Sequence, residues 1–438
     1  MNNLQSVKLG ELLISLKTGL NPRDNFKLNT PDAENWYITV RELNGLGVDF
    51  LTQTDRVNDH GLKLINNRSN LEVGDVLFSG TGTIGKTAII DRKPSNWNIK
   101  EGVYSLKPKK DKLESYYLMY FLRHLNKLNV FSKISAGSTV FSVPMKNLED
   151  LSIQIHKLPE QVKISNVLKS LDLKLELNNR MNAELEAMAK TLYNYWFVQF
   201  DFPDKYRKPY KSSGGKMVWN EELKREIPVG WEVKLLSDWI EKDKSGDWGK
   251  ESVEGNYTER VHCIRGADIN GLNGKGEVKA PVRYILPKNS HKILEPFDLI
   301  IEISGGSPTQ STGRLAFLIE ETISRFDAPV ICSNFCKAVT LKYQKSLFNF
   351  VFEWNNAYDN GVLFGFEGKT SGIKNLLFES FVTSYKTAVP PLKLMEDFFQ
   401  NVYFLELKKQ KLLKENNELA ALRDWLLPML MNGQVKVN

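Results

Sequence analysis

The sequence predicts two tandem, pseudo-symmetric domains of mixed α/β (α+β) structure, separated by two long helices that form an antiparallel coiled coil. Several short segments occur twice in the same order, each copy ends at a proline that precedes a long helical pattern, and both helical patterns keep a heptad repeat. A chain of 438 residues is long enough for two or three domains, and its 42% apolar residues suffice for real cores.

The duplication appears as pairs of similar segments that recur in the same order along the chain. An internal repeat of this kind indicates a duplicated fold, and each copy is expected to form one domain. The matching pairs are Val7–Leu13 with Val233–Ile240, Ile38–Gly45 with Cys263–Gly271, Val73–Ile90 with Pro296–Ile319, and Met145–Leu148 with Ile373–Leu376.

Each copy leads through a proline into a heptad pattern. Heptads sustained over this length predict a coiled coil, whereas two amphipathic helices in separate domain cores are the alternative. The first helix carries Ile164, Leu171, Asn178, Leu185 and Leu192 in one row and Leu168, Leu175, Asn182, Ala189 and Trp196 in the companion row. The second helix carries Phe398, Leu405, Leu412, Leu419 and Leu426.

Two asparagines occupy equivalent places near the middle of the two helices, Asn182 and Asn416. In an antiparallel pair with a central pseudo-two-fold axis, equivalent central residues approach each other. A polar residue in an apolar seam disfavours shifted registers, because a slip leaves its amide buried without a partner. We therefore expect Asn182 and Asn416 to lie close together, and the alternative is that both face solvent.

The domain boundaries follow from the repeat and from composition. The stretch after the first helix is rich in Pro, Gly, Ser and Lys, which is typical of a linker. The predicted order is a first domain (1–158), a first long helix (159–200), a linker (201–230), a second domain (231–391), and a second long helix with the C-terminal tail (392–438).

One segment spells a phosphate-binding loop, Gly80-x-x-x-x-Gly85-Lys86-Thr87. Such a loop follows a strand and opens a helix, whose N-terminus faces the phosphates. Here Val73–Ser79 is typical of a strand, but the downstream residues are β-branched and reach Pro94 within a few positions. The pattern therefore predicts a hairpin, and a P-loop-like ATPase remains the alternative.

Composition bounds the remaining classes. The chain has 59 Lys and Arg against 52 Asp and Glu, and a net charge of +7 is compatible with a polyanionic partner. The N-terminus is too polar for a signal peptide and no apolar run is long enough for a membrane span, so we expect a cytoplasmic protein that is not membrane-bound. The three cysteines and His262 lack zinc-motif spacing, so no metal site is expected.

Two further motifs fail as catalytic signatures. The double proline Pro390-Pro391 lacks the flanking residues that an adenine methyltransferase needs at its flipped base. Asp204, after Pro203, and Glu222 imitate a metal-dependent nuclease but lie in the predicted linker. We therefore expect no catalytic residues in this chain.

Over essentially its whole length the sequence resembles the specificity (S) subunit of type I restriction-modification enzymes. The most specific matches are Tyr193–Leu236 and Leu426–Val437, and the turns in Gly74–Ile90 and Phe297–Ser307 look like the core of that family's recognition domains. The order of domain, helix, domain, helix is also the layout of the family.

The resemblance implies a non-catalytic role in bacterial defence. Each target-recognition domain is expected to bind one half of a split, asymmetric double-stranded DNA target, and the helix pair to set the gap. Two modification subunits, which methylate adenine with S-adenosylmethionine, are expected to dock on the helices, and restriction subunits to add ATP- and magnesium-dependent translocation and cleavage. This chain itself is expected to hold no cofactor. A protein scaffold that does not bind DNA remains a second alternative.

Candidate DNA-binding residues are the polar and cationic side chains on turns that occur in both copies. Lys, Arg and hydroxyls suit phosphates, whereas Arg, Asn and Gln also suit base edges. In the first domain they are Arg41, Asn44, Ser79, Thr81, Thr83, Lys86, Lys133, Ser138 and Thr139. In the second domain they are Arg265, Asn270, Ser304, Ser307, Thr309, Gln310, Arg314, Lys369, Thr370 and Lys374.

Overall fold

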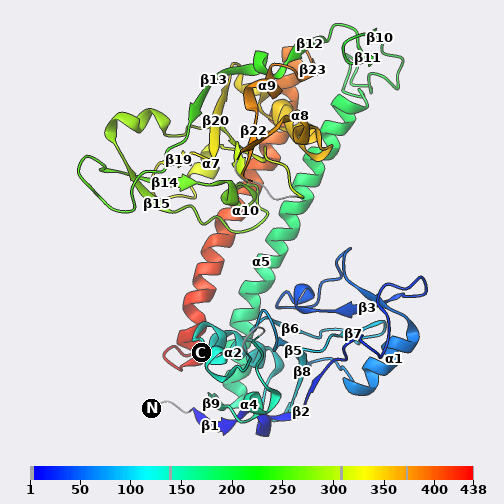
Figure 1. Cartoon of the computed structure of the whole chain (residues 1–438), viewed down its shortest axis with the longest axis vertical. Coiled ribbons are helices and arrows are strands. Elements are labelled where there is room, and N and C mark those ends of the chain that lie inside the picture. Colours follow the sequence, from blue (N-terminus) through cyan, green and yellow to red (C-terminus); the bar gives the residue numbers. More distant parts are fainter. Residues whose placement is uncertain (1–3, 138–140, 306–308, 371–372, 438) are drawn as a thin grey trace. The chain divides into compact units, whose positions relative to one another are not determined.

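The computed structural model describes residues 4–137, 141–305, 309–370 and 373–437. Contacts divide the chain into two compact units (Figure 1). Unit 1 comprises Met1–Leu177 and Asn417–Asn438, and unit 2 comprises Asn178–Asn416. Each unit thus contains an α/β domain together with a segment of each long helix, and each is described by itself. Within the described residues, no helix is both long and apolar enough to cross a bilayer.

Unit 1 is built on an antiparallel four-stranded sheet. Its strands, in spatial order, are β2 (Leu13–Thr18), β8 (Val103–Pro108), β5 (Val76–Ser79) and β6 (Thr87–Ile89). A smaller sheet joins β4 (Arg56–Val57), β3 (Asn35–Ile38) and β7 (Trp97–Ile99), and its β3–β7 pair is parallel. The strands β1 (Gln5–Lys8) and β9 (Ser152–Ile155) form a separate antiparallel pair.

Helices complete the core of unit 1. They are α1 (Asp59–Arg68), α2 (Ser115–Lys127), α3 (Val130–Ile134), α4 (Met145–Glu149) and parts of α5 (Leu158–Tyr193) and α10 (Leu392–Met431). Strand β5 is buried along its whole length, as expected for a central strand. One apolar cluster unites the sheet and α2 with Ile164 and Leu168 of α5 and with Leu427 and Leu430 of α10.

Unit 2 repeats this topology, so the predicted duplication is confirmed. Its main sheet has the order β13 (Ile240–Ser245), β20 (Cys336–Leu341), β16 (Leu299–Glu302) and β18 (Leu315–Phe317). A second sheet joins β15 (Val282–Ile285), β14 (Glu259–Ile264) and β19 (Val330–Cys332), again with one parallel pair, β14–β19. The pair β12 (Glu232–Leu235) and β23 (Lys386–Val389) matches β1 and β9.

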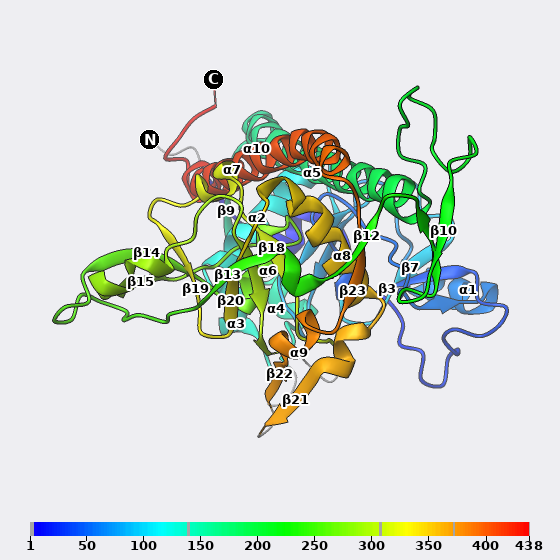
Figure 2. The same cartoon turned by 90° about the horizontal axis from the view of Figure 1, so that it is seen from above.

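One of the four segment matches is wrong. Met145–Leu148 lies in helix α4, whereas Ile373–Leu376 is strand β22. Strand β22 pairs with β17 (Ser304–Gly305) and β21 (Glu367–Thr370), and Figure 2 shows β21 and β22 extending away from the rest of unit 2. This cross-strand pairing determines the structure of Ile373–Leu376, so the similarity of its four residues to Met145–Leu148 does not predict the same structure. The helices of this part of unit 2 are α8 (Leu347–Asp359) and α9 (Phe378–Val382).

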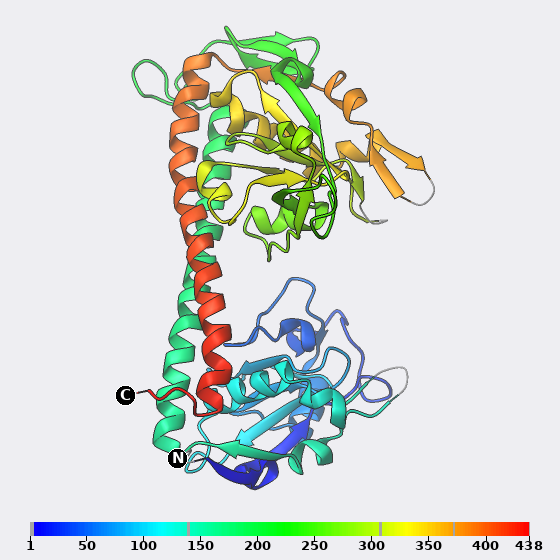
Figure 3. The ribbon, with the colours of Figure 1, turned by 90° about the vertical axis from the view of Figure 1, so that its left-hand side faces the viewer.

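The two long helices are confirmed. Helix α5 has 36 residues and continues as a π turn, η3 (Asn194–Val198), and α10 has 40 residues. In unit 2, Asn178 contacts Asn416 and Glu186 contacts Lys409, so the two helices run antiparallel. In unit 1, Asp172 contacts Arg423. Figure 3 shows α5 and α10 side by side. All the predicted heptad residues of the first helix, in α5 and its π turn, are buried or half-buried.

Asn182 and Asn416, predicted to lie within direct or water-bridged reach, form no direct hydrogen bond with each other. Asn178 Nδ2 donates to Asn416 Oδ1 at 2.9 Å and to Glu415 Oε2 at 2.8 Å. Asn416 Nδ2 in turn donates to Asn179 Oδ1 at 2.8 Å. Asn182 is 5% exposed, and neither atom of its amide has a hydrogen-bond partner. The alternative that both asparagines face solvent is therefore wrong for Asn182.

The register explains this outcome. Because Asn416 faces Asn178, the pseudo-two-fold centre of the pair lies between Asn178 and Asn182 on α5. The repeat relates Asn178 to Leu412 and Asn416 to Asn182. The position opposite Asn182 therefore carries an apolar leucine. Heptad spacing identified the buried face correctly, but it does not fix which residues of the two helices lie opposite each other.

The segment 201–230, predicted as a linker, contains a hairpin of β10 (Met217–Asn220) and β11 (Arg225–Pro228). Phe202 and Ile227 from this segment are buried in the core of unit 2. The segment therefore folds against unit 2.

We predict that Asn182→Leu stabilises the chain, because it removes a buried amide that has no partner. An unsatisfied buried polar group costs about 1–3 kcal/mol, so the thermal unfolding midpoint of unit 2 should rise by several degrees. Asn178→Leu is the matched control, since it removes a side chain that is hydrogen-bonded to Glu415 and Asn416. Calorimetry should show a lower midpoint for that variant. A lower midpoint for Asn182→Leu would contradict the register described here.

Candidate nucleic-acid interface

The glycine turn (Gly80–Lys86) connects two antiparallel strands. Strand β5 pairs with β6, so the predicted hairpin is confirmed, and no helix begins at Thr87. Ser79 Oγ accepts from the Lys86 backbone N–H at 2.8 Å and donates to the Thr83 carbonyl at 2.6 Å. These bonds close the turn on its own backbone. The helix N-terminus that binds phosphate in a P-loop is not formed by this segment.

The glycines of this turn allow close packing against neighbouring side chains. A Cβ on Gly80 would lie 2.2 Å from the ring of Tyr104. Gly85 has a φ of +92°, and a Cβ there would lie 2.2 Å from the amide of Asn126. The resemblance to a phosphate loop therefore reflects packing needs of a hairpin turn.

The structure brings several candidates of unit 1 together around this turn. Lys86 Nζ donates to the Val40 carbonyl at 3.4 Å, which places it beside Arg41. Thr81 forms a β-bridge with Ser142, next to the segment that precedes α4. Thr83, Lys86 and Arg41 are exposed, while Thr81 is half-buried. The side chains of the hairpin turn and the neighbouring Arg41, in the 3-10 turn Val40–Glu42, therefore lie near one another.

The other candidates of unit 1 do not belong to the group around the glycine turn. Asn44 closes its own turn, because its side chain donates to Asp49 and accepts the Gly47 N–H at 3.0 Å. Lys133 is exposed on the short helix α3. Ser138 and Thr139 lie outside the described residues.

The two arginines among the unit 2 candidates are paired with buried carboxylates. Arg314 makes a bidentate contact with Glu302, at 2.9 and 2.6 Å, and Arg265 makes one with Asp268, at 2.8 and 3.2 Å. The hydrogen bonds to these carboxylates raise the pKa of both arginines above the ordinary value. Both guanidinium groups therefore stay charged and hold the turns that carry them.

Most of the remaining candidates of unit 2 lie on or beside the β17–β22–β21 sheet, whereas Asn270 belongs to α6 (Ile269–Leu272). Lys374 Nζ lies 3.0 Å from Glu367 and 3.5 Å from the Gln310 carbonyl, and Ser304 is hydrogen-bonded to Asn375. Thr309, Gln310 and Asn270 are exposed. Lys369 and Thr370 belong to strand β21, but their side chains, like the whole of Ser307, lie outside the description.

Exposed aromatic residues near these turns were missed by the sequence reasoning. Phe141, beside the glycine turn, is 58% exposed, and its carbonyl accepts the Gly82 N–H at 3.2 Å. Phe335 and Phe364 are similarly exposed in unit 2. Aromatic side chains at such places can stack on bases or wedge between base steps. In the sequence, these residues could have been found as single aromatic residues within otherwise polar loops.

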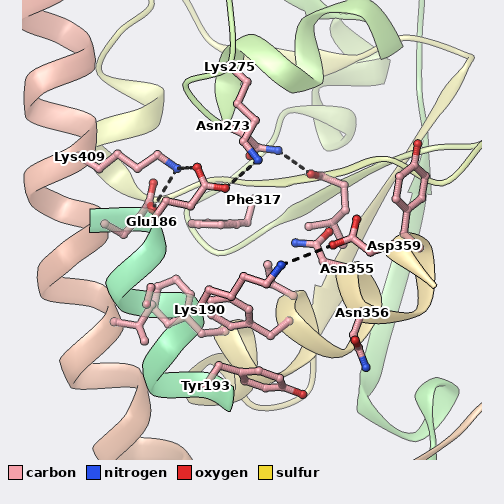
Figure 4. Close-up of a pocket in the computed structure, with 18 of the residues that line it drawn as sticks. Glu186, Lys190, Tyr193, Asn273, Lys275, Phe317, Asn355, Asn356, Asp359 and Lys409 are labelled. Atoms are coloured by element: carbon pink, nitrogen blue, oxygen red, sulfur yellow. Dashed lines mark hydrogen bonds and ion pairs between the residues drawn. The ribbon is translucent and has the colours of Figure 1, made fainter. Parts of the chain in front are cut away.

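A pocket of about 300 Å³ lies in unit 2 between the long helices and the α/β domain (Figure 4). Its floor is apolar and its rim carries paired charges. Glu186 lies 2.7 Å from Lys275 and 3.9 Å from Lys409, and Lys190 lies 3.9 Å from Asp359. The DNA-binding candidates that line it are Asn270, Gln310 and Arg314.

The described residues hold no group of three or more His, Cys, Asp or Glu side chains arranged to bind a metal ion. Cys263, Cys332 and Cys336 are all buried. Burial raises the pKa of Cys263 and Cys336 to about 12 and that of Cys332 further. A thiolate is the metal-binding form, so these neutral thiols are core residues.

The nuclease-like residues also have structural roles. Asp204 accepts the backbone N–H groups of Tyr206 and Lys208, each at 2.8 Å. Glu222 forms an ion pair with Lys386 at 2.8 Å. The carboxylates are thus used in a turn and in a surface pair.

Comparison with known proteins gives consistent relatives. Residues 1–187 match the family model of the type I restriction modification DNA specificity domain. The chain is 24% identical over 369 residues to the type I restriction enzyme MjaIX specificity subunit of Methanocaldococcus jannaschii, covering 83% of this chain and 78% of the relative. It is 27% identical over 134 residues to the HindI specificity subunit of Haemophilus influenzae, covering 30% of this chain and 29% of the relative.

The fold is also found among solved structures. The crystal structure of the type I restriction-modification system S subunit from M. genitalium matches with a TM-score of 0.57 at 16% sequence identity. The match covers 98% of this chain and 96% of that chain. It confirms the predicted fold class of two mixed α/β domains with a pair of long helices.

We predict that the three thiols are unreactive in the folded chain. At pH 8, well below a pKa of about 12 for Cys263 and Cys336, Ellman's reagent should label less than one thiol per chain, because burial keeps the groups neutral. In urea all three cysteines should react. Added chelator should not change the native rate. Fast labelling that appears only after chelation would instead indicate a metal site.

Proposed function

We propose that this chain is a specificity subunit of a type I restriction-modification complex, and that it selects DNA for that complex without catalysing a reaction itself. Each α/β domain reads one half of a split, asymmetric double-stranded DNA target. The helix pair sets the gap between the halves and docks two adenine-methylating modification subunits. S-adenosylmethionine, ATP and magnesium act in the modification and restriction partners, and this chain requires none of them.

The observation that carries the proposal is one scaffold used twice with different turns. Strands β5 and β6 in unit 1 correspond to β16 and β18 in unit 2, in sheets of the same order. Between them, unit 1 carries the short glycine turn with Lys86, whereas unit 2 carries a longer connection, residues 303–314, that ends at Arg314. Reading two different half-sites requires such a shared frame with different polar side chains.

The charges on these turns fit contact with DNA. The described contact of the Lys86 ammonium is a backbone carbonyl, so its charge remains available for a phosphate. In unit 2, Arg314 and Arg265 are held by carboxylates, so exposed Gln310, Thr309 and Asn270 are better placed for base edges.

The long helices support the roles of spacer and docking surface. At 1.5 Å per residue, the 36 residues of α5 span about 54 Å, a length that suits two separated half-sites. Met188 on α5 and Leu422 on α10 occupy equivalent places in the repeat and are 56% and 43% exposed. Leu173 and Trp425 are exposed on the helices as well. Exposed apolar side chains on these helices suit contact with partner subunits.

The alternatives predict different behaviour. A P-loop-like ATPase would turn over ATP and lose this activity in Lys86→Ala, but the closed hairpin offers no phosphate cradle. A protein scaffold would show no DNA binding that depends on salt. Neither alternative accounts for two domains of equal topology with different turns.

We predict that Lys86→Ala weakens DNA binding by the chain in complex with its modification subunit. Loss of one phosphate contact should reduce affinity for target and non-target DNA similarly, and lower the slope of log affinity against log salt by about 1. Binding titrations at several salt concentrations measure both quantities. Lys224→Ala is the control, since Lys224 is exposed and paired with Glu221 in the β10–β11 turn. Affinity of the wild-type complex that does not change with salt would favour the scaffold.

A further inference from the structure

A buried carboxylate in unit 1 collects three donors from two other helices. Asp172 on α5 is 7% exposed. Its Oδ2 accepts from Arg123 Nη1 at 2.8 Å and from the Tyr120 hydroxyl at 2.9 Å, both on α2. Its Oδ1 accepts from Arg423 Nη1 of α10 at 2.8 Å. A buried charge is tolerated only with such a complete set of partners, so the geometry of this cluster is tightly specified.

Arg123 also contacts the glycine turn and packs against the turn that Asn44 closes. Its Nε donates to Thr87 Oγ1 at 3.0 Å, and Thr87 directly follows Lys86 of the glycine turn. Its Nη2 lies where a Cβ on Gly45 would be, only 1.9 Å away, and Gly45 has a φ of +97°. Gly45 directly follows Asn44 in the second turn. One guanidinium group therefore connects the α5 carboxylate to both turns.

We propose that Arg123 is a positioning residue for DNA reading by unit 1, and that Asp172 fixes its position. This inference rests on the proposed function and adds the residues that hold the reading surface in place. The Arg123 side chain is 23% exposed, and its Nε and Nη1 donate to Thr87 and Asp172. It acts through Thr87 and the Gly45 backbone. Its planar fork donates in two fixed directions while packing against Gly45, which a lysine ammonium on a flexible stem cannot reproduce.

The repeat shows that this device is specific to unit 1. An ion pair joins Lys127 of α2 to Asp424 of α10 at 2.9 Å, and its equivalent in unit 2 joins Asp359 of α8 to Lys190 of α5, with the charges exchanged. These two ion pairs show which residues of unit 1 and unit 2 correspond to each other near the cluster. Helix α2 of unit 1 corresponds to α8 of unit 2. The segment of α10 in unit 1 corresponds to the segment of α5 in unit 2.

With this alignment, Asn355 occupies the place of Arg123, Ala189 that of Arg423, and Glu406 that of Asp172. All three residues line the pocket of unit 2, and Figure 4 labels Asn355 among them. The two guanidinium groups of unit 1 thus correspond to smaller side chains beside an open pocket in unit 2. Substitution of Arg123 should consequently affect one half of the target only.

Arg123→Lys tests the proposal in the complex with the modification subunit. Binding is measured on DNA with base changes in one half of the target at a time, and the half read by unit 1 is the one whose recognition changes when Thr81 and Lys86 are substituted together. We expect discrimination in that half to fall about tenfold, the effect of one misplaced base contact, and discrimination in the other half to stay within twofold.

Gly45→Ala is the second variant, because the added Cβ displaces the Arg123 guanidinium without removing a charge. It should produce the same one-sided loss, and it carries the test if Arg123→Lys does not fold. Asn355→Ala, at the equivalent place in unit 2, should leave discrimination in the unit 1 half unchanged.

Two results have distinct meanings. A wild-type complex that selects no DNA sequence contradicts the proposed function itself. A wild-type complex that selects DNA, together with variants that lose thermal stability or affinity equally for both halves, overturns the positioning role and leaves Arg123 as a purely structural residue.

Discussion

The return of α10 to unit 1 is the constraint on which the rest of the structure depends. Leu427 and Leu430, near the end of this helix, are buried in the same apolar cluster as Ile164 and Leu168 of α5. The second unit has the reverse arrangement, because the far end of α5 supplies Tyr193 and other residues to its core. Each α/β domain is therefore completed by both helices. Such long-range contacts make the antiparallel helix pair part of both cores.

Polar contacts add specificity to this apolar pairing. In unit 1, Asp172 joins the two helices to α2 through arginines. In unit 2, Asn178 and Asn416 hold the helices in one register. Buried polar groups contribute less to net stability than apolar packing, but a shifted arrangement leaves them unpaired. The apolar rows thus favour association, and these few groups select one alignment.

Much of the fold was predictable from the sequence, since it depends on patterns that local physics produces. The repeated strands, the two long helices and the hairpin at Gly80–Lys86 all follow from periodicity and from residues such as Pro94 that exclude a helix. The helix register was not predictable, because heptads define a face and leave the facing residue open. The match of Met145–Leu148 to Ile373–Leu376 failed since tertiary pairing determines the strand β22.

The candidate site was predicted less completely than the fold. The sequence located the turns, but it did not show that Arg314 and Arg265 are occupied by Glu302 and Asp268. It also gave no sign of Arg123, which lies inside a helix and contacts an aspartate far along the chain. These roles depend on distances between side chains that are remote in sequence. Such distances become visible only when the fold is known.

The central claim is that each domain reads its own half of one DNA target. The most direct measurement is sequencing of methylated adenines in cells that carry the modification subunit with this chain or its variants. Combined substitution of Thr81 and Lys86 in unit 1 should change the motif on one side of the gap, and substitution of Thr309 and Gln310 in unit 2 the motif on the other side. The gap should stay the same in both cases. A variant that alters both halves together, or neither, would contradict the account.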